Sequence, residues 1–382
     1  MNIYSCKIHY VYECLSLLNV LAEPAPYFKT HLDKSAADYD IIPGPREEKF
    51  VKLLQRIEDD AREEFAQDID DIRSYYALED KISYSFASML LLHDSVCPAI
   101  YDIPENISIK AYQKSIKDIS DESYNKHFYQ LIRRAGKNSS DNDDVDSADL
   151  LDIINAIYEM DIADSDKLKL QQLYIHRSEH IPKLFNYLNR AAAVLKKCEK
   201  KLEEFGKETI AYTQKEAKDE PYFDFFMKKM GYPSSGFSSS NDCYITISYL
   251  NCMKVSLSLK GDDLKTARPI SQIGAIYSDN LTYDKIMIRR KSITQDKALT
   301  ILKLLSDKSK LEILQLTKDE AYYGAQLANK IGLTTATISH HTSSLFEQNL
   351  LQIEKVDSKI FYKQNQETVR SLIKYLEDTL LQ

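Results

Sequence analysis

A glycine between two short helical segments near the C-terminus constrains this chain more than any other feature. Ala328 stands four residues before Gly332, and Ile338 stands six residues after it. This spacing supplies a small residue where two helices cross, a turn residue that tolerates a positive φ, and an apolar anchor on the second helix. We therefore predict a helix-turn-helix, with helices over 323–331 and 335–348.

The second predicted helix has two contrasting faces. Thr334 precedes it and is a favourable N-cap residue, as Asp307 is for a helix predicted over 308–316. Residues at spacings of four and seven share one side of a helix, which predicts a packed face and an exposed face. The packed face consists of Ile338, Thr342 and Leu345, and the roughly opposite face of Thr337, His340 and Ser344.

Two strand-like runs follow this helix. Residues 350–356 and 360–363 flank the tripeptide at 357–359, and their apolar positions partly alternate. This pattern predicts a half-buried β-hairpin. The chain then ends in an amphipathic helix over 368–381, whose apolar stripe consists of Val369, Leu372, Ile373, Leu376 and Leu380.

Residues 296–382 resemble the ArsR family of winged-helix repressors. The matching stretches are LLSDKSKLEILQLT, YGAQLANKIGLTTATISHHTSSLFEQNLL and a hairpin that ends in IFYK. The family has a serine followed closely by histidine on its recognition helix, where this chain has Ser339, His340 and His341. Two positions depart from the family pattern: Thr342 replaces a leucine, and Asn349 replaces a glycine.

The resemblance implies a sequence-specific transcriptional repressor that binds double-stranded DNA as a homodimer. Candidate DNA-binding residues on the second helix are Thr335, Thr337, Ser339, His340, His341 and Ser344, and those near the hairpin tip are Lys355 and Lys359. The plain alternative is that these are ordinary polar surface residues and that His341 is a half-buried helix residue.

Charge gives this interpretation limited support. Residues 331–346 contain no Asp or Glu, as a surface that faces phosphates requires. However, residues 293–382 carry 11 Lys or Arg and 11 Asp or Glu, so the segment is neutral, and the net charge of −8 comes from residues 1–292. A neutral segment also fits a different class of function, in which the winged helix binds another protein and the remainder is a scaffold.

Most of residues 1–230 has helical periodicity, with loop-like composition at 136–146 and 231–242. Helices are predicted over 45–78, 150–158 and 181–205. Two β-branched runs within 243–259 predict strands, and 270–277 adds a third. We therefore expect a mainly α protein in three parts: a helical domain at 1–230, a small β-containing segment at 242–290 packed on it, and a winged helix-turn-helix at 294–382.

The front of the chain shows no signature of an enzyme. The phosphate-binding motifs GxGxxG and GxxxxGK[ST] and the nucleophile motif GxSxG are absent. We expect no catalytic activity, no cofactor and no metal. His176 and His180 have the spacing of a helical metal pair, but a solvated helix surface is the competing interpretation.

We expect the protein to be cytoplasmic, because its six cysteines form no CxxC pair and no segment has the composition of a signal peptide or a membrane span. The front, with most of the 26 tyrosines, is expected to dimerise or to sense a small effector. Its aromatic residues could line a pocket, or they could simply pack.

Overall fold

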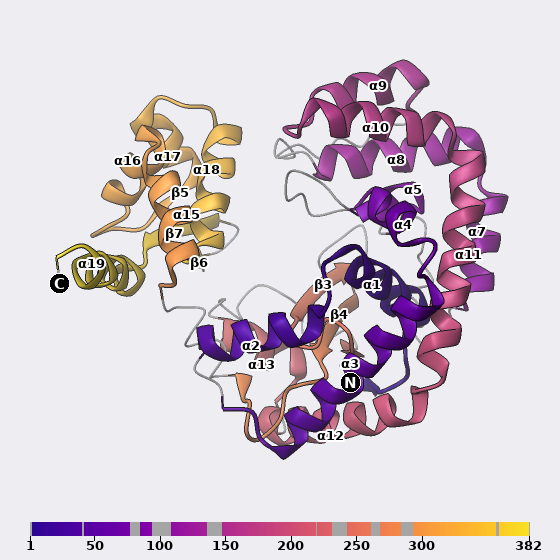
Figure 1. Ribbon diagram of the computed structural model, residues 1–382. Helices are drawn as coiled ribbons and strands as arrows, with labels where there is room; N and C mark the ends of the chain where they lie inside the picture. The colour runs from indigo at the N-terminus through magenta and orange to yellow at the C-terminus, as the bar shows by residue number, and fades with distance from the viewer. Residues whose placement is uncertain are drawn as a thin grey trace.

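A computed structural model describes residues 2–39, 42–76, 85–93, 108–135, 147–218, 220–230, 243–260, 268–283, 293–356 and 359–381. Buried apolar side chains form two separate clusters, one between Ile8 and Tyr283 and the other between Ala298 and Leu372. We call residues 2–283 the body and residues 293–381 the C-terminal unit (Figure 1). Helices make up most of the described chain and the sheets are small, which confirms the mainly α prediction.

The body is an assembly of helices around a small sheet. Its helices are α1 (Tyr10–Ala22), α2 (Tyr27–Tyr39), α3 (Pro45–Glu64), α4 (Ile69–Tyr76), α5 (Phe86–Leu90), α7 (Ile109–Asp118), α8 (Asp121–Ala135), α9 (Leu150–Tyr158), α10 (Asp164–Ile175), α11 (Arg177–Lys196), α12 (Glu199–Ala217) and α13 (Tyr222–Met230). Helix α1 packs against α3, α4 and α11, so the first helix of the chain lies in the centre of the body. None of the described helices is long and apolar enough to cross a lipid bilayer.

Two predicted helices are each interrupted in the structure. The helix predicted over 45–78 ends at Glu64, and the chain turns at Phe65 before α4 begins. The helix predicted over 181–205 is divided into α11 and α12 near Cys198. The helix predicted over 150–158 is confirmed without change as α9, because Asp149 caps it and forms a reciprocal capping box with Asp152.

The sheet of the body joins the two ends of the body's sequence. Its strands are β1 (Asn2–Ser5), β2 (Cys243–Ser248), β3 (Val255–Lys260) and β4 (Arg268–Gly274), in the spatial order β1-β2-β4-β3. Strands β1, β2 and β4 are parallel, and β3 is antiparallel to β4. Strands β2 and β3 and most of β4 confirm the predicted β element. Strand β1 could not be predicted from the sequence, because four residues are too few to show a period.

The C-terminal unit has the order helix, helix, helix-turn-helix, hairpin, helix. Its elements are α15 (Gln295–Leu305), α16 (Lys308–Leu316), β5 (Tyr322–Tyr323), α17 (Gly324–Ile331), α18 (Thr335–Glu347), β6 (Leu351–Val356), β7 (Lys359–Gln364) and α19 (Gln366–Leu380). The three strands form a sheet in the order β5-β7-β6. A helix-turn-helix followed by a β-hairpin is the winged-helix arrangement that the sequence predicts.

Local signals set the bounds of these elements. The Asp307 side chain accepts a hydrogen bond from the Lys310 N–H at the start of α16, and Thr334 does the same for Thr337 at the start of α18. Gly332 has a φ of 78°, in the left-handed region that ends a helix. Asn349 has a φ of 59°, so it adopts the left-handed conformation as well, which asparagine tolerates better than most residues.

Candidate nucleic-acid interface

The inner face of α18 fixes the helix against the rest of the C-terminal unit. Ile338, Thr342 and Leu345 are all fully buried, as their spacing predicts. The Thr342 hydroxyl donates to the carbonyl oxygens of Ile338 and Ser339, at 2.9 and 3.0 Å. Because its own helix satisfies this hydroxyl, the threonine occupies a leucine position without leaving an unpaired buried polar group.

The opposite face of α18 is polar and partly solvent-accessible. Thr335 and Ser339 are exposed, and the other candidate residues on the helix are half-buried. The Ser344 hydroxyl donates to the His340 carbonyl oxygen at 3.1 Å. The hydroxyl oxygens of Thr334 and Thr337 lie 2.8 Å apart, so one donates to the other. Because these polar side chains are short and are bonded to their own helix, the polar surface lies close to the helix axis. This leaves room for a nucleic-acid groove to approach α18.

His341 lies closer to α16 than the other candidates do. Its Nδ1 atom is buried and has no hydrogen-bond partner among the described residues. Burial, together with the nearby charge of Lys310, lowers the pKa of His341, and the Asp307 carboxylate opposes this shift. The ring of His340 lies 5.9 Å from that of His341, at an angle of 72°. The two histidines are therefore adjacent, but their environments differ.

Strands β6 and β7 of the hairpin after α18 are paired as far as Val356 and Lys359. Val356 pairs with Lys359 and Lys355 pairs with Ile360, so the backbone places both candidate lysines beside the tip. Asp357 and Ser358 lie outside the described residues. The hairpin is held to the helices through β5, where the rings of Tyr323 and Phe361 meet edge to face at 5.5 Å.

One exposed cation that is not among the predicted DNA-binding residues lies just before the turn. Lys330 is in the last turn of α17, and its ammonium lies 5.0 Å from the centre of the Tyr322 ring. The charge of Lys330 matters for this surface, because the charge of Lys310, another cation of the unit, is offset by an ion pair with Asp307 at 3.1 Å. A lysine in the last turn of the first helix of a helix-turn-helix is a signal that the sequence does contain.

The candidate metal pair in the body has a structural role instead. His176 is exposed at the junction between α10 and α11, one helical turn before His180. The His180 Nδ1 atom forms a 2.6 Å hydrogen bond with the hydroxyl of Tyr75, and burial lowers the pKa of His180. Among the residues that the structure describes, no group of three or more His, Cys, Asp or Glu side chains could hold a metal ion.

Comparisons with known proteins find only distant similarity. No protein-family model and no curated protein sequence matches the chain. Among solved structures, reduced HlyU from Vibrio cholerae N16961 is similar at 22% identity over 23% of this chain and 92% of HlyU, with a TM-score of 0.19. NolR from Sinorhizobium fredii is similar at 27% identity over 22% of this chain and 85% of NolR, with a TM-score of 0.20.

Proposed function

We propose that the protein is a transcriptional regulator that binds double-stranded DNA through α18, as a repressor of the ArsR type. The outer face of α18 carries the proposal: it is polar and free of carboxylates over 335–346, while the inner face is fully buried. A helix anchored on one side can enter the major groove with the other, and the absence of carboxylates avoids repulsion by phosphates. Such a regulator would act in the cytoplasm.

We further propose that the C-terminal unit forms a homodimer through its first and last helices. Leu299 and Leu302 of α15 are 51% and 41% exposed, and Ile373 and Leu380 of α19 are 51% and 73% exposed. Exposed apolar side chains on both helices favour burial against a second copy. This interface would place two copies of α18 on one duplex. The body would then sense an effector or strengthen the dimer without a catalytic role.

The first test is selection of binding sites from a random duplex library, followed by fluorescence anisotropy of the enriched duplex at two salt concentrations. Replacement of His340 by alanine is expected to weaken specific binding about five- to hundredfold, the range for one base contact. Ser115→Ala is the matched control, because Ser115 is exposed on α7 of the body, where its hydroxyl donates to the Ala111 carbonyl oxygen. The slope of log affinity against log salt should be about −0.9 for each phosphate contacted.

Failure to enrich any sequence would contradict the proposal and favour a second candidate. The neutral charge of residues 293–382 also suits a protein-binding module on a scaffold, because such a surface needs no excess of cations. Under that alternative, affinity for duplex DNA would be weak at all salt concentrations, and the intact chain would form a stable complex with another protein.

A further inference from the structure

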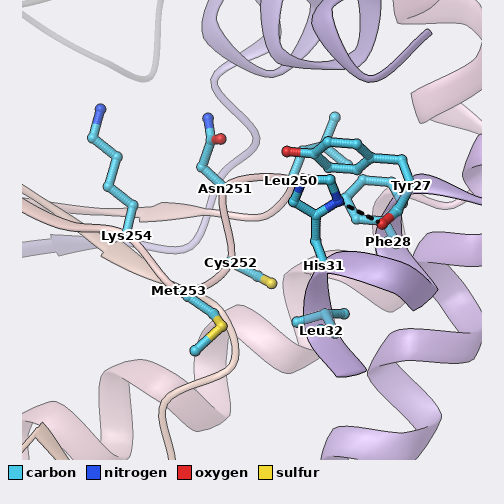
Figure 2. A pocket seen from close by; sticks show the side chains of 9 residues that line it. All are labelled: Tyr27, Phe28, His31, Leu32, Leu250, Asn251, Cys252, Met253 and Lys254. Carbon is cyan, nitrogen blue, oxygen red and sulfur yellow. Dashed lines mark hydrogen bonds between the residues drawn. The ribbon is translucent and has the colours of Figure 1, made fainter. Parts of the chain in front are cut away.

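A small open pocket lies in the body at the carboxyl end of β2. It is formed by the start of α2 on one side and by the loop over 250–254 on the other, and its volume is about 190 Å³ (Figure 2). Loops at the carboxyl ends of parallel strands are frequent ligand sites, because the strands hold them at one edge of a sheet. The pocket is distant in sequence from the C-terminal unit and has no part in the proposed DNA interface.

Two buried carboxylates fix the two walls of this pocket. On α3, Glu58 accepts hydrogen bonds from the backbone N–H groups of Tyr27 and Phe28, at 2.8 and 3.2 Å. On α1, Glu13 accepts from the N–H groups of Tyr249 and Leu250, at 2.8 and 2.9 Å. Each carboxylate thus holds two consecutive peptide groups at the edge of the pocket. The walls are therefore ordered before any ligand binds, which lowers the entropic cost of binding.

The pocket presents flat aromatic and apolar surface. The rings of Tyr27 and His31 are stacked, with their centroids 3.9 Å apart and an interplanar angle of 27°. Leu32 from α2 and Met253 from the loop add half-buried apolar surface, and Cys252 lies buried between them. A thioether beside aromatic rings favours an aromatic ligand over an aliphatic one of the same size.

The lining contains a cation and no carboxylate, although the protein as a whole is acidic. Figure 2 shows the side chains of Lys254 and Asn251 extending the same way from the loop. The Lys254 side chain is exposed, and its ammonium donates to the Tyr12 hydroxyl at 3.1 Å. Two further N–H donors of this ammonium therefore remain for an anion.

The other polar atoms of the lining offer acceptors. The Asn251 amide nitrogen donates to Tyr12 and to Ser16, at 3.1 and 2.8 Å, which uses both of its hydrogens and leaves Oδ1. His31 uses Nδ1 to contact the Tyr27 carbonyl oxygen at 3.0 Å, which leaves Nε2. These atoms suit a ring N–H or hydroxyl on a ligand whose anionic end lies at Lys254.

We propose that this pocket binds a small aromatic monocarboxylate, with its ring against Tyr27 and His31 and its carboxylate at Lys254. A route toward the C-terminal unit exists along the chain. The Lys254 carbonyl oxygen accepts from the Gly274 N–H at 2.6 Å, and β4 ends at Gly274, shortly before the segment that leads to residue 293. That the ligand controls DNA binding rests on the proposed function; that it binds does not.

Indole-3-acetate is a suitable probe, because the chain contains no tryptophan and indole fluorescence therefore reports only the ligand. We expect saturable binding to the full chain. Lys254→Met should weaken it about tenfold, the usual effect of one lost charge-assisted hydrogen bond. Leu32→Phe, which fills the cavity from α2, should weaken it further. The matched control is Lys29→Met on the exposed side of α2, which should bind as the unmodified protein does.

The neutral analogue indole-3-ethanol should bind at least tenfold more weakly than indole-3-acetate. Absence of saturable binding by indole-3-acetate would overturn the proposal. So would an affinity of Lys254→Met and of Leu32→Phe for indole-3-acetate that equals the affinity of the unmodified protein. Repeating the titration with the selected duplex separates the two claims. Ligand binding that leaves DNA affinity unchanged would exclude regulation by the pocket. Ligand binding by a protein that selects no duplex would refute the DNA-binding proposal and leave the pocket intact.

Discussion

The body and the C-terminal unit are stabilised by polar contacts of very different sequence range. In the body, Arg46 donates to the carbonyl oxygens of Phe205, Ala275 and Ile276, contacts that span 159 to 230 residues. In the C-terminal unit, the contacts that begin α16 and α18 span three residues. Arg46 thus joins backbone groups that are distant in the sequence, whereas these caps act within one turn of the helix that they begin. The longest of the side-chain-to-backbone contacts described in the unit spans 50 residues, from Gln364 to the Leu314 carbonyl oxygen.

This difference predicts at which positions a substitution should change stability most. A long-range donor that is lost leaves several buried acceptors unpaired at once, and each unpaired group costs free energy. A lost cap or turn residue affects one helix end, at about 1 kcal/mol. Substitutions of Arg46, Glu13, Gly332 and Asn349 are therefore expected to change stability in decreasing order.

Replacement of Arg46 by methionine should destabilise the body by about 3–5 kcal/mol, because the guanidinium also bonds the Thr209 hydroxyl and the Glu208 carboxylate. Hydrogen exchange measured by mass spectrometry should show faster exchange in α12 and in β4, with α17 and α18 unchanged. Arg73→Met is the control, because Arg73 is 44% exposed, pairs with Asp70, which is 96% exposed, and donates to a single, exposed carbonyl oxygen, that of Ala22. It should change stability by less than about 0.5 kcal/mol. Equal increases in exchange throughout the chain would contradict this difference between the body and the C-terminal unit.

Replacement of Glu13 by glutamine should change how stability depends on pH. Burial raises the pKa of Glu13 to about 7 from the ordinary 4.5, although two backbone N–H groups and Lys254 oppose the shift. Between these values the folded protein binds a proton that the unfolded chain releases. This contribution to stability is therefore complete below pH about 4.5 and is lost as pH rises through 7.

The free energy of unfolding of the unmodified protein, relative to that of Glu13→Gln, should thus fall by about 2–3 kcal/mol from pH 4.5 to 8. Urea denaturation at a series of pH values measures this difference. Glu63→Gln, at an exposed position on α3, should keep the pH dependence of the unmodified protein. A difference that rises with pH would show that the two N–H donors outweigh burial.

Replacement of Gly332 by alanine should destabilise the C-terminal unit by about 1 kcal/mol. A Cβ atom there would meet no atom within 4 Å, so the whole effect comes from the φ of 78°. Gly324→Ala is the matched control: its Cβ would also lie in open space, but it begins α17, where alanine is favourable. Thermal unfolding should show a loss for the first variant and a gain for the second. Equal effects would contradict an origin in backbone strain.

Replacement of Asn349 by glycine should change stability least, by less than about 0.5 kcal/mol. Glycine relieves the left-handed φ of 59°, but the substitution removes the hydrogen bond from the Asn349 amide to the Thr368 hydroxyl at 3.2 Å. Asn349→Ala loses both the hydrogen bond and the tolerance of asparagine for the left-handed conformation, and it should lower the free energy of unfolding by about 1–2 kcal/mol. Denaturant titration of both variants distinguishes these two contributions, and similar losses would show that the hydrogen bond dominates.

The winged helix could be predicted from the sequence because its signals are short-range. Thr334 caps the helix that follows it, and Gly332 takes the conformation that glycine allows most easily. The polar face of α18 follows from the same spacing that predicts its buried face. The half-buried position of His341 was one of the two alternatives that the sequence left open. Its proximity to Lys310 and Asp307 of α16 could not be predicted, because that depends on how two helices cross.

In the body, the sequence predicted element types better than connections. The breaks near Phe65 and Cys198 carry no glycine or proline signal, and packing of the flanking helices places them. Strand β1 has partners only because Asn2 to Ser5 align with Cys243 to Thr246. The pocket could not be predicted from the sequence either, since α2 and the loop over 250–254 meet only in the folded body.

Local sequence was therefore enough to predict the caps, the glycine turn, the buried stripe of α18 and the polar surface opposite, since each depends on residues within one or two turns of helix. The distant backbone groups that Arg46, Glu58 and Glu13 bond could be identified only from the folded chain. A buried charged side chain needs hydrogen-bond partners, and the fold determines which peptide groups lie within its reach. No local sequence pattern indicates where those peptide groups are.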